Sequence, residues 1–181
     1  MIFGFRSIFI TIIVLISLLS CKQEKKKPTF TEFMKIKSEL VTVNKALVIK
    51  IADSIKTVSN QKHWGLQSTQ TGLWYKIYHV GKGDSAHINQ VVTVSYKLRL
   101  FDGKLCYSTD TTGPKSFILG RSGMENGLEE GLRMLRVGDS ARFVLPPHLA
   151  HGLLGDQKKI PKLAIIIYDV TLQAVQKTEE E

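Results

Sequence analysis

The chain of 181 residues has room for one domain of ordinary size with short appendages. Its apolar fraction of 43% and charged fraction of 23% are close to those of an ordinary globular protein, which argues against disorder and against several membrane spans. The formal net charge is +9, but no cluster of basic residues with aromatic partners stands out on one element. The composition therefore does not favour nucleic-acid binding.

Residues 1–20 have the pattern of an export signal. Arg6 carries their only charge, a nearly unbroken apolar run extends from Ser7 to Leu19, and Cys21 follows where a signal peptide would be cut. A membrane-spanning helix needs about 20 apolar residues, so a cleaved signal fits this run better than a permanent anchor. A short uncleaved anchor stays open as the alternative.

The segment 21–71 predicts a basic tether followed by a long helix. Four lysines between Lys22 and Lys27 are either a solvated tether or a contact to anionic lipid headgroups. From Phe33 to Val58, apolar residues recur at spacings of three and four, and Thr29 and Glu32 form a capping box at the start. We expect the apolar stripe to pack on its own domain first, and to form a homodimer or contact a membrane otherwise. Polar residues after Ser59 mark the boundary at residue 72.

Residues 72–175 predict an α+β domain, followed by an acidic tail over residues 176–181. Alternating apolar residues and turn clusters predict β-strands at Leu73–Val80, Gln90–Phe101, Lys104–Thr109, Phe117–Gly120, Ser140–Leu145 and Ala164–Leu172. Asp102-Gly103 suits a type I′ hairpin turn, and the spacing from Asn126 to Val137 predicts one short helix. We therefore expect a curved antiparallel sheet of about five to six strands wrapped on that helix.

These elements, with the strings VVTVSYKLRLFDGK, FILG, GLEEGLRMLRVGDSARFVLPPHLAHG and IPKLAIIIYDV, resemble the FK506-binding-protein (FKBP) family of peptidyl-prolyl isomerases. The order of signal, helix and the stretch Thr71–Tyr75 is similar to FKBP-type lipoproteins of Bacteroidetes-like bacteria, including gliding-motility-associated ones. Leu18 to Cys21 resembles a lipobox, which makes Cys21 the lipid-anchor residue. The resemblance implies an extracytoplasmic, periplasm-facing envelope isomerase without cofactor, acting on proline-containing segments of unfolded or exported proteins.

The resemblance also implies which residues line the groove. Rotation about an X–Pro amide meets a barrier of about 18–20 kcal/mol, and a dry groove lowers it by favouring the twisted amide. The implied catalytic positions are Tyr96, Tyr107, Phe117, His151, Ile160 and Tyr168, with the backbone N–H of Ile160 facing the peptide carbonyl. The implied substrate-binding positions are Cys106, Met124, Glu125 and Leu128. Metal-ligand spacing is absent from the sequence, so no metal is expected.

Several groove positions depart from the family pattern. Cys106-Tyr107 replaces Phe-Asp and removes an acidic group, Leu128 replaces a large floor residue, and His151 replaces a Tyr. Lys115 stands where an aromatic is usual, and Glu125 where a small aliphatic residue donates its N–H. We therefore expect weakened or retuned isomerisation. A prolyl-peptide-binding chaperone, or an assembly factor for a surface or gliding machine, is the alternative function. His151 also fits a half-exposed loop histidine, and Cys106 a buried apolar filler.

Overall fold

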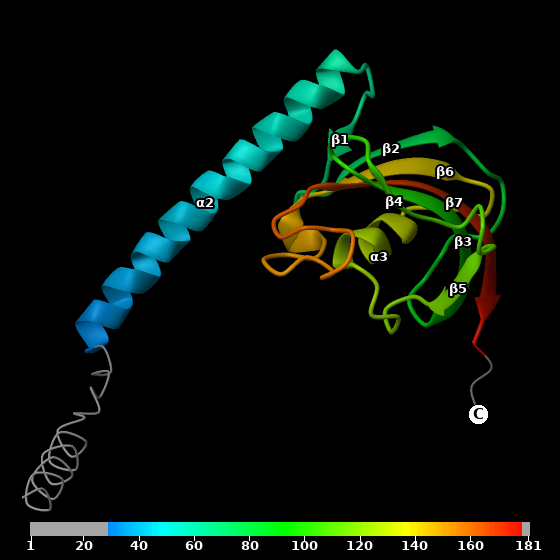
Figure 1. Cartoon of the computed structure of the whole chain (residues 1–181). Helices are drawn as coiled ribbons and strands as arrows, with labels where there is room; N and C mark the ends of the chain where they lie inside the picture. The colour runs from blue at the N-terminus through cyan, green and yellow to red at the C-terminus, as the bar shows by residue number, and fades with distance from the viewer. Residues whose placement is uncertain (1–28, 179–181) are drawn as a thin grey trace, which may run out of the picture. The chain divides into compact units, whose positions relative to one another are not determined.

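The computed structural model describes residues 29–178, and the chain divides after Val43 into two compact units that are treated separately. Figure 1 shows the elements in chain order. They are α2 (Phe30–Gln61), β1 (Gln67–Ser68), β2 (Trp74–His79), β3 (Gln90–Leu100), β4 (Leu105–Ser108), β5 (Lys115–Ile118), α3 (Asn126–Leu132), β6 (Ser140–Leu145), the 3-10 turn η1 (Pro147–Leu149) and β7 (Ile166–Lys177).

The predicted signal and lipid-anchor residue Cys21 lie outside the described residues. Within residues 29–178, no helix combines the length and the apolar character needed to cross a membrane.

Helix α2 starts at the predicted capping box. The Thr29 N–H donates to Glu32 Oε2 at 2.8 Å, and the Glu32 N–H donates to Thr29 Oγ1 at 3.4 Å. These reciprocal bonds satisfy donors that the first helical turn leaves free, which confirms the predicted start. The apolar stripe is exposed along much of the helix, with Phe30 at 79%.

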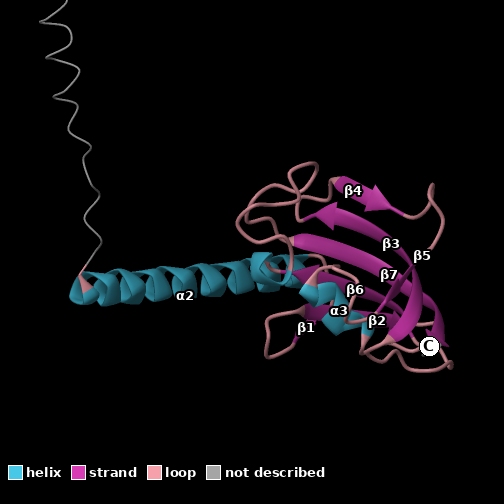
Figure 2. Ribbon diagram, turned by 90° about the horizontal axis from the view of Figure 1, so that it is seen from below, coloured by secondary structure: helices cyan, strands magenta, loops and turns pink. Residues whose placement is uncertain are grey.

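Seven strands form one antiparallel sheet in the order β1-β2-β6-β7-β3-β4, with β5 paired to β3. The sheet curves around α3 (Figure 1, Figure 2), and the predicted α+β class is confirmed. The predicted count of five to six strands misses β1, which has only two residues. Strand β7 extends to Lys177, beyond its predicted end at Leu172, because the residues from Ala174 to Lys177 pair with β3 even though they lack an alternating apolar pattern.

The hairpin between β3 and β4 differs from the predicted type I′ turn, which requires positive φ at both central residues. Only Gly103, with φ of +96°, adopts that conformation. Asp102 instead uses its side chain, whose Oδ1 accepts the Lys104 N–H at 2.9 Å. A register shift between Leu98 and Arg99 accompanies the turn. The expectation was wrong because a bulged hairpin needs left-handed backbone at one position only.

Helix α3 packs very closely on the sheet. Leu128 and Leu132 are fully buried, and a Cβ added at Gly131 would lie 2.7 Å from the Phe143 ring. A Cβ at Gly127 would lie 2.7 Å from Leu145 Cγ, so both glycines allow the helix axis to approach β6. This packing fixes the position of the α3 N-terminus, where Glu125 is the N-cap residue.

A second core lies on the opposite face of the sheet. Val144 and Ile167 alternate along their strands with Phe143 and Ile166 of the main core, so they point to the other side. Ile55 of α2 is buried against them. Half-buried apolar residues around this cluster are Ile51, Trp64, Leu66, Trp74, Phe101 and Ile165. Every residue of both cores lies between Ile51 and Val175, so a chain beginning at Lys22 keeps all of them.

We expect Ile55→Ala to lower the free energy of unfolding by about 2–5 kcal/mol, since it removes a fully buried side chain and leaves a cavity. The matched control is Ile49→Ala on the same helix, where the side chain is 52% exposed. That control should change stability by less than about 0.5 kcal/mol. Urea denaturation of both variants measures the difference, and equal effects would show that the second core contributes nothing.

Candidate functional site

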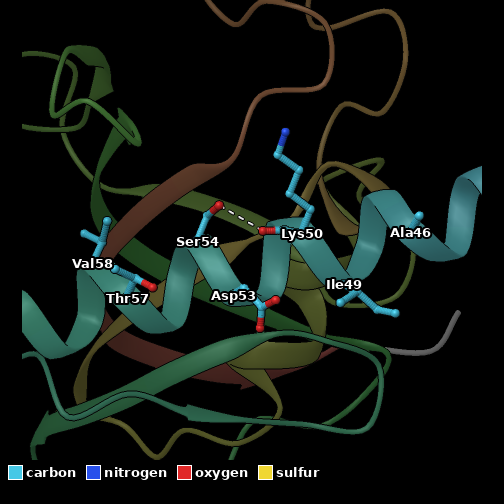
Figure 3. Close-up of a pocket in the computed structure, with 7 residues that line it drawn as sticks. All are labelled: Ala46, Ile49, Lys50, Asp53, Ser54, Thr57 and Val58. Atoms are coloured by element: carbon cyan, nitrogen blue, oxygen red, sulfur yellow. Dashed lines mark hydrogen bonds between the residues drawn. The ribbon is translucent and has the colours of Figure 1, made fainter.

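A hollow of about 660 Å³ lies along one face of α2 (Figure 3). It is lined by Ala46, Ile49, Lys50, Asp53, Ser54, Thr57 and Val58. All seven residues belong to one helix, and the Ser54 hydroxyl is already bonded to the Lys50 carbonyl at 2.8 Å. A hollow walled by a single helix cannot surround a ligand, so it is a poor candidate for a catalytic site.

A smaller pocket of about 310 Å³ brings together distant parts of the chain. It lies between strands β3, β4 and β7, the loop before α3, and the segment joining η1 to β7, which we call the 150–165 loop. Six predicted site residues line it: Tyr96, Tyr107, Met124, Glu125, His151 and Tyr168. The pocket thus brings together six of the ten residues that the resemblance implied for a prolyl groove.

The other four predicted site residues are not in the pocket lining. Cys106, Leu128 and Ile160 are buried, at 2% exposure or less, and Phe117 is half-buried. All four belong to the main core or pack against it. Burial also raises the pKa of the Cys106 thiol, which matches its expected role as an apolar filler.

Two tyrosines form an aromatic wall. The rings of Tyr96 and Tyr168 meet edge to face, with centroids 5.3 Å apart and planes at 65°. The Tyr168 hydroxyl donates to both Glu125 carboxylate oxygens at 3.0 Å. Burial, and then the nearby Glu125 charge, raises the pKa of Tyr168 well above its usual range. Tyr168 therefore remains a protonated donor at neutral pH.

Glu125 connects three elements at the pocket. Its side chain is only 8% exposed, and Oε1 lies 2.8 Å from His151 Nε2. With Tyr168 on β7, this contact joins the start of α3 to the 150–165 loop. His151 is therefore a pocket residue with a specific partner. The backbone N–H of Glu125 has no hydrogen-bond acceptor among the described residues, so it is free to meet a ligand carbonyl.

Asp156 supplies an acidic group to the pocket that was not predicted from the sequence. Its Oδ2 accepts a short hydrogen bond from the Tyr107 hydroxyl. Burial opposes the charged form of Asp156, but that bond and three backbone N–H donors hold the pKa of its carboxyl well below the usual range. Asp156 was not predicted as a site residue because it is far from Tyr107 in sequence, in a Gly-Asp stretch whose pattern indicates only a loop.

The backbone N–H of Ile160 is occupied. It donates to Asp156 Oδ1 at 2.7 Å, and the N–H groups of Lys158 and Lys159 donate to the same oxygen at 2.9 Å. The predicted contact from Ile160 to a peptide carbonyl is therefore not available in this conformation. These three hydrogen bonds compensate the Asp156 carboxylate for the hydration that it loses in a half-buried loop.

The pocket is more polar than the predicted dry groove. Four lining residues were not predicted from the sequence, namely Leu98, Gly123, Asp156 and Lys158, and Lys115 was predicted only as a departure from the family pattern. Lys115 Nζ lies 3.5 Å from Met124 Sδ. Charges of both signs thus border the aromatic wall, which fits a surface that binds backbone as well as apolar groups.

We expect Tyr107 to titrate with a pKa of about 12, because its hydrogen bond to Asp156 favours the protonated phenol. Since the folded-state pKa lies above the usual 10.0, the stabilisation is complete below pH 10 and is lost as the pH rises towards 12. The measurement is the phenolate absorbance of the native chain, with Tyr107→Phe assigning the transition. Asp156→Asn should move this pKa downward, and an unchanged pKa would contradict the bond.

Comparison with known proteins shows to which family the chain belongs. The family model for the FKBP-type peptidyl-prolyl cis-trans isomerases matches residues 83–173, a range that contains all ten predicted groove positions. The chain belongs to this family.

The FKBP assignment agrees with individual relatives. A Haemophilus influenzae protein named in the same family is 32% identical over 167 residues, covering 88% of this chain and 67% of that protein. FkpA of Escherichia coli K12 is 37% identical over 112 residues, covering 61% of this chain and 40% of FkpA. The crystal structure of Escherichia coli FkpA superposes with a TM-score of 0.59 and 26% identity, covering 92% of this chain and 82% of the other. The sequence match alone covers 40% of the length of FkpA.

Proposed function

We propose that this FKBP-family chain is a peptidyl-prolyl cis-trans isomerase that assists the folding of exported proteins in the bacterial cell envelope. The observation that carries the proposal is the pocket itself, where the edge-to-face pair of Tyr96 and Tyr168 stands beside the unpaired N–H of Glu125. This arrangement offers an apolar wall and one backbone donor at the same place.

These groups suffice for the reaction because no bond to a heavy atom breaks. Rotation about the X–Pro amide destroys resonance, so the transition state is the twisted amide with a more localised carbonyl. The tyrosine rings shield the prolyl ring from water, and the Glu125 N–H is placed to donate a hydrogen bond to the rotated carbonyl. The protons of Tyr168 and Tyr107 remain on their hydroxyls throughout.

We propose further that the rate is reduced relative to a wholly apolar groove. The Glu125 carboxylate, held by Tyr168 and His151, brings negative charge close to the position that a peptide carbonyl would occupy. A carboxylate repels the carbonyl oxygen in both the planar and the twisted states and keeps water nearby. A comparison of the chain starting at Lys22 with His151→Tyr and Tyr107→Asp tests this idea. A gain in kcat/KM on either substitution supports a retuned site, whereas a loss in both contradicts it.

The proposed location is extracytoplasmic, with lipid on Cys21 holding the chain at a membrane. The support is the lipobox-like sequence Leu18–Cys21, and the same plan suggests a Bacteroidetes-type lipoprotein. Several acyl chains at one residue give stable membrane attachment, since each buried methylene contributes roughly 0.8 kcal/mol. Cell fractionation tests the anchor: Cys21→Ser should move the chain from the membrane to the soluble fraction, and continued membrane attachment would refute lipidation.

A second candidate is a chaperone, or an assembly factor for a surface or gliding machine, that binds prolyl segments without turnover. The polar pocket favours it, and the exposed stripe of α2, including Phe30 and Leu40, favours a homodimer that would present two such pockets. Suppression of client aggregation with no peptide turnover would select the chaperone. Sedimentation at micromolar concentration tests the dimer, and a monomer would exclude it.

A further inference from the structure

Two leucines are exposed to solvent on the 150–165 loop, which forms one wall of the pocket. Leu153 and Leu154 are 74% and 75% exposed, although large apolar side chains are usually buried. The pair presents apolar surface to solvent, and contact with a bound chain would remove that surface from water.

The loop that carries these leucines is firmly held at its base. The Gly152 N–H donates to the Pro147 carbonyl at 2.8 Å, and the Leu163 N–H donates to the Gly152 carbonyl at 2.9 Å. The Asp156 N–H donates to the Ile160 carbonyl at 3.0 Å. The leucines are thus exposed by a hydrogen-bonded loop rather than by a segment without contacts.

The same loop is also tied to strand β4. Lys159 Nζ donates to the Cys106 carbonyl at 2.8 Å and lies 4.9 Å from the centre of the Tyr107 ring. The loop that carries the leucines is therefore attached to the pocket wall that Tyr107 forms.

The leucines are continuous with the pocket. Leu153 follows the lining residue His151 by two positions, and Leu154 precedes the lining residue Asp156 by two. Cα atoms two residues apart lie within about 7.6 Å, which an extended peptide covers in two to three residues. A chain held in the pocket by its proline thus has neighbouring side chains within reach of the leucines.

We infer that Leu153 and Leu154 form a docking patch for an apolar side chain of the bound polypeptide, located roughly two to four residues from its proline. This inference rests on the proposed function, because it extends the substrate of the same pocket. It defines the substrate as a non-native protein segment in which apolar residues flank a prolyl bond. Native proteins bury such residues, so the patch distinguishes unfolded chains from folded ones.

Polypeptide is a better occupant than a lipid surface. Lys158, Lys159 and Lys162 follow the leucines, but Lys158 lines the pocket and Lys159 Nζ donates to the Cys106 carbonyl. A membrane-inserting loop instead keeps its basic side chains available for lipid headgroups.

The test compares the chain starting at Lys22 with its Leu153→Ser, Leu154→Ser double variant. The readout is affinity for fluorescently labelled, reduced and carboxymethylated α-lactalbumin, which stays unfolded. We expect a loss of roughly tenfold in affinity, as partial burial of two leucines implies, with no change in turnover of a short prolyl peptide. Val80→Ser is the control, since Val80 is 74% exposed in the turn after β2 and should leave affinity unchanged.

Equal affinity of the double variant and the wild-type chain would overturn the docking patch, as would absence of client binding by the wild-type chain. Loss of binding to anionic phospholipid vesicles with client binding intact would also overturn it and assign the leucines to a membrane. Failure of the wild-type chain on the short peptide would instead reject the proposed isomerase, and client binding would still decide the patch.

Discussion

Gly155→Ala should strongly reduce both the stability of the domain and its catalytic activity. Gly155 has φ of +67°, and a Cβ added there would lie 2.2 Å from the Ile160 carbonyl oxygen, which belongs to the backbone. The 150–165 loop must therefore open, and it carries His151 and Asp156 into the pocket. Small displacements of groups that position a substrate have large effects on rate, so we expect kcat/KM to fall on the order of tenfold or more.

Gly113→Ala is the control that distinguishes the steric clash at Gly155 from the cost of a left-handed backbone conformation. Gly113 also has a positive φ, at +78°, but an added Cβ meets no atom within 4 Å. Both substitutions therefore carry the left-handed penalty of about 1–2 kcal/mol, and only Gly155→Ala adds a steric clash. We expect Gly155→Ala to lower the free energy of unfolding by about 1–3 kcal/mol more than Gly113→Ala does. Equal unfolding curves would show that the loop accommodates the methyl group.

Glu125→Leu should change stability and activity in opposite directions. Removal of the carboxylate leaves the buried Tyr168 hydroxyl and His151 Nε2 without their shared partner, which should cost about 1–3 kcal/mol in unfolding free energy. The same substitution removes negative charge beside the backbone N–H that is placed for the peptide carbonyl. We therefore expect kcat/KM for a prolyl peptide to rise by roughly tenfold, the equivalent of about 1.4 kcal/mol in the barrier.

Glu130→Leu is the matched control on the same helix. Its carboxylate accepts the Thr71 hydroxyl at 2.8 Å and does not line the prolyl pocket. We expect it to leave kcat/KM unchanged. A fall in kcat/KM for Glu125→Leu would contradict the view that this carboxylate weakens catalysis, and would make Glu125 a positioning residue that the reaction needs.

The sequence allowed prediction of elements that depend on local pattern. The capping box at Thr29, the strand Ser140–Leu145 and the start of α3 at Asn126 all appear where the spacing of apolar, polar and turn residues indicated. The extension of β7 to Lys177 was not predicted, because it depends on pairing with β3 and not on the local pattern of residues.

The chemistry of the pocket was harder to predict. The resemblance identified Tyr96, Glu125 and Tyr168, but not that Glu125 would be held between Tyr168 and His151. That contact joins residues on three elements, so it depends on the assembled sheet and loops. The Asp156 bond to Tyr107 has the same origin, which is why an acidic group expected to be lost is present.

The most direct test of the account is the rate of cis-trans isomerisation of a short Xaa-Pro peptide by the chain starting at Lys22. The control is Tyr168→Leu, which removes one ring of the aromatic wall and keeps an apolar side chain at that position. The account predicts acceleration over buffer at micromolar protein and its loss in the variant, with both proteins shown to be folded by circular dichroism. No acceleration by the folded wild-type chain, or equal acceleration by the Tyr168→Leu variant, would contradict the proposal that this pocket catalyses prolyl isomerisation.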